Sequence, residues 1–246
     1  MPNIFTLIGQ SWELYKSQPV LNSVLVWLMI FPMSVLQLLA MLEEQYSYTE
    51  QLWNAGSYGA LFLNVCIYIA CTLLLVWGTA CTLIIGKKLI SSRAGRSRSS
   101  FGTLRKQGRK YIIPILFTGI LQQCFVFFWA LLLVVPGLIY AIRTFFYQVI
   151  IVAEGKQYRD ALKKSKNAVL GHTWTTLLHL IGIGILLFLP VYFIDDMSHI
   201  ALSSIDERLL PAQVVISGSI YSFASMISTL TIIGLYAAVK KLPKKA

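Results

Sequence analysis

Five polar side chains lie inside long apolar runs of this sequence, where lipid would be the solvent. They are Arg143, Gln122, Gln123, Gln148 and His179. A central Arg in a membrane costs at least about 2.5–3.5 kcal/mol, so such residues usually face a bundle interior or a wet cavity. A guanidinium there can bind a phosphate or a carboxylate with two hydrogen bonds. These five residues form our candidate site for an anionic ligand.

Each of these residues also has a structural explanation. The long stem of Arg143 could carry its guanidinium to the headgroup layer, or to Asp195 and Asp196. The glutamine amides and the imidazole of His179 could instead hydrogen-bond between helices and hold them together. The sequence leaves both explanations open.

Motifs for catalysis or for a metal are missing from the sequence. We find no nucleophile elbow, no HExxH, and no glycine-rich phosphate loop followed by Lys. His172 and His179 are seven residues apart and share a helical face, but no third ligand accompanies them. The four cysteines lie within apolar runs and lack paired spacing. We therefore expect no enzyme, no cofactor and no metal.

The composition indicates the kind of structure that must position these residues. Hydrophobic residues make up 57% of the chain and charged residues 13%, whereas soluble domains have about 45–50% and about 25%. Five of six apolar runs reach the roughly 20 residues that cross a bilayer, and the fourth is short. The runs are 21–42, 60–85, 111–135, 138–152, 174–194 and 214–239. We predict one all-α integral membrane domain over residues 1–246, with six transmembrane helices.

Charge between the runs predicts how the chain is oriented. Segments 87–110 and 156–170 are both rich in Lys and Arg, which is typical of cytoplasmic loops. An even number of crossings must separate them, and two spans joined by a tight outer turn at Pro136-Gly137 satisfy this condition. The linkers after the first and fifth runs are acidic and are predicted outside, so both termini are predicted in the cytoplasm. Arg143 would then lie about 9 Å below the outer turn.

Two segments outside the runs have the period of amphipathic helices. Residues 3–17 and 156–170 each place apolar side chains on one face, and we expect both to be interfacial helices at the cytoplasmic surface. The basic loop 87–110 has one aromatic residue, Phe101, and no nucleic-acid-binding module, so we expect anionic lipid and not nucleic acid as its partner. Its predicted membrane-surface residues are Arg96, Arg98, Arg105, Lys106, Arg109 and Lys110.

The central third of the chain resembles a known family. The resemblance rests on Val134-Val135-Pro136-Gly137-Leu138-Ile139-Tyr140, Val149-Ile150-Ile151-Val152-Ala153-Glu154-Gly155, Ala161-Leu162-Lys163-Lys164-Ser165 and Leu170-Gly171. This order is similar to the YciC-like bacterial inner-membrane proteins, whose superfamily includes the membrane domain of some glycerophosphoryl diester phosphodiesterases. The resemblance implies a six-span helical bundle in a bacterial cytoplasmic membrane. It implies no activity, because those phosphodiesterases carry their chemistry on a separate soluble domain.

Three classes of function follow from these observations. The leading hypothesis is a non-catalytic membrane protein that binds or moves a lipid or a small amphiphile, at a site near Arg143. The alternative is a structural or regulatory scaffold, whose interfacial helices and basic loop dock membrane protein partners. An intramembrane enzyme ranks last.

Overall fold

The computed structural model of the protein describes residues 2–90, 100–205 and 210–242. Every regular element in these ranges is a helix, so the all-α class is confirmed. In chain order the elements are α1 (Ile4–Ser17), α2 (Val20–Val24), the π-helix η1 (Leu25–Ile30), α3 (Phe31–Tyr46), α4 (Tyr48–Asn54), α5 (Tyr58–Ile90), α6 (Phe101–Leu132), α7 (Val134–Thr144), α8 (Tyr147–Glu154), α9 (Tyr158–Val169), α10 (Thr173–Ile205) and α11 (Leu210–Lys240).

Six helical stretches of the described chain are long and apolar enough to cross a membrane. They are Val20–Glu44, Tyr58–Lys87, Phe101–Leu132, Val134–Glu154, Thr173–Leu202 and Pro211–Lys240. Each contains one of the six apolar runs predicted from the sequence. The protein is therefore a multi-pass membrane protein.

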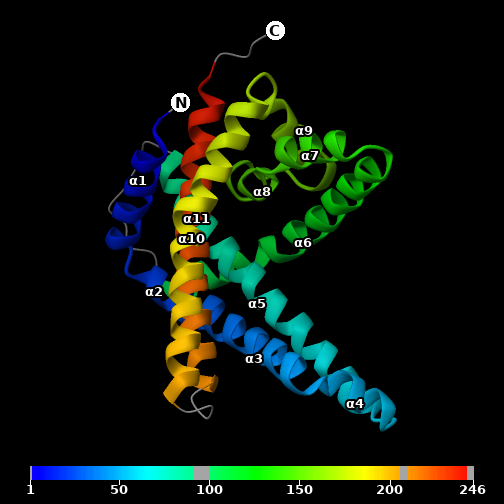
Figure 1. Ribbon diagram of the computed structural model, residues 1–246. Coiled ribbons are helices and arrows are strands. Elements are labelled where there is room, and N and C mark those ends of the chain that lie inside the picture. Colours follow the sequence, from blue (N-terminus) through cyan, green and yellow to red (C-terminus); the bar gives the residue numbers. More distant parts are fainter. Residues whose placement is uncertain (1, 91–99, 206–209, 243–246) are drawn as a thin grey trace.

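The helices are arranged around a column formed by α10 and α11, which pack side by side (Figure 1). Two arms leave the column on the same side of the view. One arm contains α3, α4 and α5, and the other is the hairpin of α6 and α7. Helix α1 packs along α11, and α9 lies near the end of the column where α10 begins and α11 ends.

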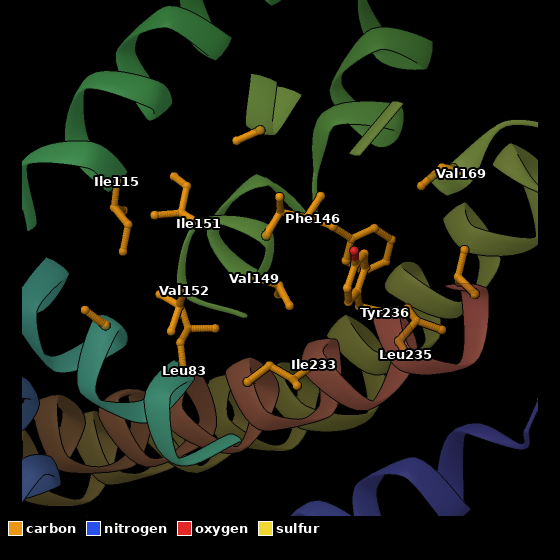
Figure 2. Close-up of a cluster of buried hydrophobic side chains, with 14 of the residues drawn as sticks. Leu83, Ile115, Phe146, Val149, Ile151, Val152, Val169, Ile233, Leu235 and Tyr236 are labelled. Carbon is orange, nitrogen blue, oxygen red and sulfur yellow. The ribbon is translucent and has the colours of Figure 1, made fainter. Parts of the chain in front are cut away.

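Helix α8 is the centre of the larger hydrophobic core (Figure 2). Ile150 and Ile151 are fully buried there, and Leu83 of α5 and Ile233 of α11 belong to the same cluster. The predicted apolar face of 156–170 is buried against protein at Ala161, Leu162, Ser165 and Val169 of α9. The amphipathic pattern of α9 therefore reflects packing on the neighbouring helices.

The turn between the third and fourth runs lies at Leu133, so its predicted place at Pro136-Gly137 is wrong. Leu133 is extended, with φ −160° and ψ 133°, and α7 begins at the next residue. Pro136 is the third residue of α7, where the missing N–H would have no helical partner. Gly137 lies against Ala130 of α6, whose backbone nitrogen would be 2.9 Å from an added Cβ. Pro136 and Gly137 thus begin a helix and let it approach α6.

The predicted fourth run, 138–152, is two helices, because the chain turns at Phe145 and Phe146. The backbone N–H of Phe146 donates to the hydroxyl of Ser165 in α9, at 3.1 Å. This tertiary hydrogen bond accompanies the break between α7 and α8.

Two further boundaries differ from the sequence prediction. The basic segment 87–110 is helical over 87–90 and again from Phe101, because Leu104 and Gly108 pack against α5. Helix α10 continues eleven residues past the predicted end of the fifth run, through Asp195. A hydrogen bond from Gln213 of α11 to Asp195 Oδ1, at 3.0 Å, ties the two helices together in this extension.

Gly78 of α5 lies in a close contact between α5 and the first span. Pro32 has no N–H to donate to the Leu28 carbonyl four residues earlier, and the chain widens into the π-helix η1 just before it. A Cβ on Gly78 would lie 2.9 Å from that carbonyl oxygen and 2.9 Å from Met29 Cγ. The helices can approach this closely because position 78 is Gly.

We expect Gly78→Ala to lower the free energy of unfolding in detergent by about 1–2 kcal/mol, because a backbone oxygen cannot give way to the new methyl group. The matched control is Gly184→Ala in α10, where an added Cβ meets nothing within 4 Å. The control should be neutral or stabilising by about 0.5–1 kcal/mol, since Ala favours helix over Gly. Equal unfolding transitions for the two variants would contradict the close contact.

Candidate functional site

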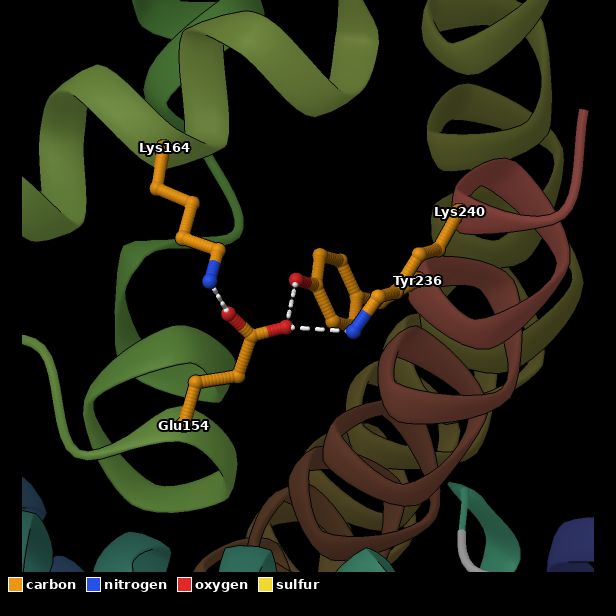
Figure 3. A network of polar contacts seen from close by, with 4 residues as sticks. All are labelled: Glu154, Lys164, Tyr236 and Lys240. Atoms are coloured by element: carbon orange, nitrogen blue, oxygen red, sulfur yellow. Dashed lines mark hydrogen bonds and ion pairs between the residues drawn. The ribbon is translucent and has the colours of Figure 1, made fainter. Parts of the chain in front are cut away.

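Glu154 is the centre of a charged cluster that joins three helices (Figure 3). Its Oε1 accepts hydrogen bonds from the hydroxyl of Tyr236 and the amine of Lys240, both at 2.8 Å. Its other oxygen forms an ion pair with Lys164 of α9. The Glu154 side chain is only 13% exposed, whereas the two lysines are about half exposed. The cluster thus places a buried carboxylate among donors from α9 and α11.

The local sequence explains how Glu154 reaches this position. Gly155 adopts the left-handed conformation, with φ 70°, and ends α8 directly after Glu154. Gly adopts this conformation without steric cost, so it is the common residue at a helix C-terminus. Tyr236 and Lys240 are four residues apart and therefore share one face of α11, which is the face turned to α8.

A cavity of about 600 Å³ lies beside this cluster, between α9 and the end of α11. Four lysines line it together with Asn167, His172 and Tyr236, and apolar side chains at the ends of α9 and α11 complete the wall. The lysines are Lys156, Lys163, Lys164 and Lys240, and the apolar residues include Ala168, Leu170, Val239 and Leu242. Asp160 also lines the cavity. Amines next to an apolar wall suit an anionic group attached to a carbon chain.

The structure brings three of the predicted site residues together. Gln122, Gln123 and Gln148 line one cavity of about 370 Å³ between α6, α7, α8 and neighbouring helices. The Gln122 amide donates to the Thr144 hydroxyl at 3.0 Å, and the Gln148 amide donates to the Tyr147 hydroxyl at 3.0 Å. Both amides thus make the hydrogen bonds expected of packing between or within helices.

Arg143 and His179 lie outside that cavity. Thr144 faces α6, and its neighbour Arg143 points about 100° further round α7, toward α10. There its Nε donates to the Thr173 hydroxyl at 3.2 Å, and Arg143 lines a separate cavity of about 400 Å³. His179 Nδ1 lies 2.8 Å from the Thr175 carbonyl of its own helix. The five residues therefore do not form one pocket.

Arg143 lies near the end of α7, beside the first residue of α10. Its contact with Thr173 puts it at the start of α10, which is the end of the column that the sequence assigns to the cytoplasm. The hydroxyl of Ser165 in α9 donates to the Arg143 carbonyl at 2.8 Å and fixes the same end of α7. The break between α7 and α8 thus leaves Arg143 near the end of a separate helix and not within one straight span over 138–152.

The basic residues predicted at the membrane surface fall into two groups. Arg105, Lys106, Arg109 and Lys110 are exposed on the first turns of α6. Arg96 and Arg98 lie outside the described residues. The described residues contain no group of three or more His, Cys, Asp or Glu side chains that could hold a metal ion.

Sequence reasoning missed the cluster around Glu154, although a signal was present. Glu154 is the only acidic residue between Glu50 and Asp160, and it ends an apolar segment. A lone carboxylate in that position needs a partner. The partners could not be identified from spacing, because Lys240 is 86 residues away in the sequence.

Comparisons with protein-family models, with curated proteins and with solved structures gave no match for this chain.

Proposed function

We propose that this protein is a non-catalytic membrane protein that binds an anionic lipid or a small anionic amphiphile. The proposed site is the cavity between α9 and α11. The observation that carries the proposal is the grouping of four lysines beside an apolar wall at one end of a membrane-spanning helix. The proposal keeps the ligand class expected from the sequence and moves the site from Arg143 to this cavity.

The charges at the cavity favour an anion. Four lysines and one carboxylate, Asp160, line the cavity, and Glu154 beside it pairs with two of these lysines, Lys164 and Lys240. Glu154 holds these two amines in place, so they are preorganised when a headgroup arrives. Lys156 and Lys163 extend the positive surface from α9. A phosphate or carboxylate would gain charge-assisted hydrogen bonds from these amines.

The apolar side of the cavity favours a ligand with a hydrocarbon part. Leu170, Val239 and Leu242 line it, and a free phosphate would leave these side chains without a contact. The proposal includes a bacterial cytoplasmic membrane, with the α9 end of the column on the cytoplasmic side. The concentration of Lys and Arg at that end supports this orientation.

Lipid retention after gentle purification tests the proposal. Lys156→Gln combined with Lys163→Gln should weaken binding of an anionic phospholipid about ten-fold, because two charge-assisted contacts are removed. The measurement is native mass spectrometry in one detergent, with phosphatidylglycerol and phosphatidylcholine added in turn.

The matched control is Lys16→Gln combined with Lys166→Gln, which removes two exposed amines, one on α1 and one on α9, outside the cavity. The control pair should retain phosphatidylglycerol as the unmodified protein does. Equal retention by the two double variants, or no preference for the anionic lipid in the unmodified protein, would refute the proposed site.

A further inference from the structure

The tip of the α6–α7 hairpin is entirely apolar. No polar side chain other than the hydroxyl of Tyr140 and the indole of Trp129 occurs from Phe125 to Tyr140. The side chains of Leu131, Leu132, Leu133, Val134 and Val135 are between 60% and 76% exposed. Turns in water are built from Gly, Pro, Asn, Asp and Ser, which interact with water or tolerate special backbone angles. An apolar surface of this kind marks a contact with another apolar phase.

The backbone of this turn also suits an apolar phase. The turn is a single residue, Leu133, whose N–H donates to the Trp129 carbonyl at 3.0 Å. The N–H of Gly137 donates to the Leu133 carbonyl at 3.4 Å. Pro136, in the first turn of α7, has no N–H that would need a partner. These two hydrogen bonds and the proline reduce the number of backbone groups that the turn would leave unpaired in hydrocarbon.

The base of the hairpin is held at one end of the column. On the α6 side, the Thr118 hydroxyl accepts from the backbone N–H of Tyr158 in α9, at 3.1 Å. On the other side, Arg143 contacts Thr173 at the start of α10, and Glu154 contacts Lys240 at the end of α11. Helix α10 begins at the end of the column where α11 ends. Both limbs of the hairpin are therefore attached to that end of the column.

Measured from the contacts that join it to α9, neither limb of the hairpin is long enough to cross a bilayer. Fourteen residues separate Thr118 from the end of α6 at Leu132, and they span about 21 Å. Helix α7 has 11 residues and is about 16 Å long. Near its end the Arg143 carbonyl is bound by the Ser165 hydroxyl of α9. The hydrocarbon core of a bilayer is about 30 Å thick. In Figure 1 the tip lies far from α4 and from the last turns of α10, in the same half of the view as α9.

The charges on the two limbs agree with this geometry. Arg109 and Lys110 precede the apolar stretch on α6, and Arg143 follows it on α7, with no charge between Tyr111 and Ile142. Basic residues on both sides of the apolar stretch favour placing the starts of both limbs at the same face of the membrane. Charge alone requires an even number of crossings between them, and zero crossings satisfy this as well as two.

We propose that α6 and α7 form a re-entrant hairpin, which enters the leaflet on the α9 side and ends in its hydrocarbon. The partner of the exposed tip is the acyl chains of that leaflet. Four of the six apolar stretches then cross the bilayer, and both termini still lie on one side. This inference is independent of the proposed lipid site.

Thiol labelling tests the hairpin in the full chain. Val134→Cys is introduced where Cys66, Cys71, Cys81 and Cys124 have been changed to Ala, and an impermeant maleimide is applied to each face of sealed vesicles. Asn54→Cys on α4 and Lys166→Cys on α9 are exposed controls, expected to react from opposite faces. We expect Val134→Cys to react from neither face, to react fully in detergent, and to carry a fluorophore that lipids brominated on the acyl chain quench.

Four results would overturn the proposal. Reaction of Val134→Cys from the face of the Asn54→Cys control would show two crossings. Reaction from the face of the Lys166→Cys control would place the tip in water, as would a lack of quenching. Disulfide-linked dimers through Val134→Cys would assign the tip to a second copy of the chain.

A second variant keeps the test open if the chain without native cysteines does not fold. Val134→Asp, in the chain with its own cysteines, places a charge at the tip. In hydrocarbon this charge should sharply reduce the amount of folded protein recovered from membranes. Asn54→Asp, the control on α4, should leave the yield unchanged. Equal yields for the two variants would contradict the re-entrant hairpin.

Discussion

Phe146→Ala should lower the free energy of unfolding by about 3–5 kcal/mol, because it empties a fully buried aromatic position. The Phe146 ring has no exposed surface, and its centroid lies 5.4 Å from that of the Tyr236 ring. It belongs to the core around α8, with Val149 and Ile151 (Figure 2). Unfolding in mixed micelles, followed by circular dichroism against increasing denaturing detergent, measures the change.

Phe145→Ala is the matched control, because the neighbouring ring is 38% exposed and the residue lies in the same turn. We expect Phe145→Ala to lower the free energy of unfolding by less than about 1.5 kcal/mol, since the Phe145 ring buries less apolar surface than the Phe146 ring does. Equal losses for the two variants would mean that the turn itself, and not the buried Phe146 ring, holds α8 in place.

The helices themselves could be predicted from the sequence, because their signal is local. Long apolar runs without charge must form helices in lipid, where every backbone polar group needs an internal partner. All six runs are helical in the structure, although their ends differ. The face of α9 was also predictable, since Ala161, Leu162, Ser165 and Val169 repeat with the helical period and are buried.

The ends and breaks of the helices were harder to predict, because tertiary contacts set them. Pro136 and Gly137 are typical of a turn, but the same pair also suits the first turn of a helix packed closely on its neighbour. The break at Phe145 and Phe146 contains no Gly or Pro, and it depends on the Ser165 hydroxyl from another helix. No local pattern contains that information.

The candidate site was predictable only in its chemistry. Sequence reasoning identified a cation near an apolar surface as a site for an anionic headgroup, and selected Arg143. In the structure four lysines gather around one cavity, from α9, its preceding segment and the end of α11. In the sequence these lysines indicate orientation, and Lys163 and Lys164 also belong to the family resemblance. Their convergence depends on how α9 packs, which the sequence does not encode locally.

Glu154→Ala should lower the free energy of unfolding by about 2–3 kcal/mol, mainly because the buried Tyr236 hydroxyl loses its acceptor. Lys164 and Lys240 contribute little to this loss, since both are about half exposed and water can solvate them. Tyr236→Phe isolates the hydroxyl. In that background Glu154→Ala should cost at least about 1 kcal/mol less, a coupling that a double-mutant cycle measures by micelle unfolding. Additive losses would show that the carboxylate stabilises the fold through its lysines and not through Tyr236.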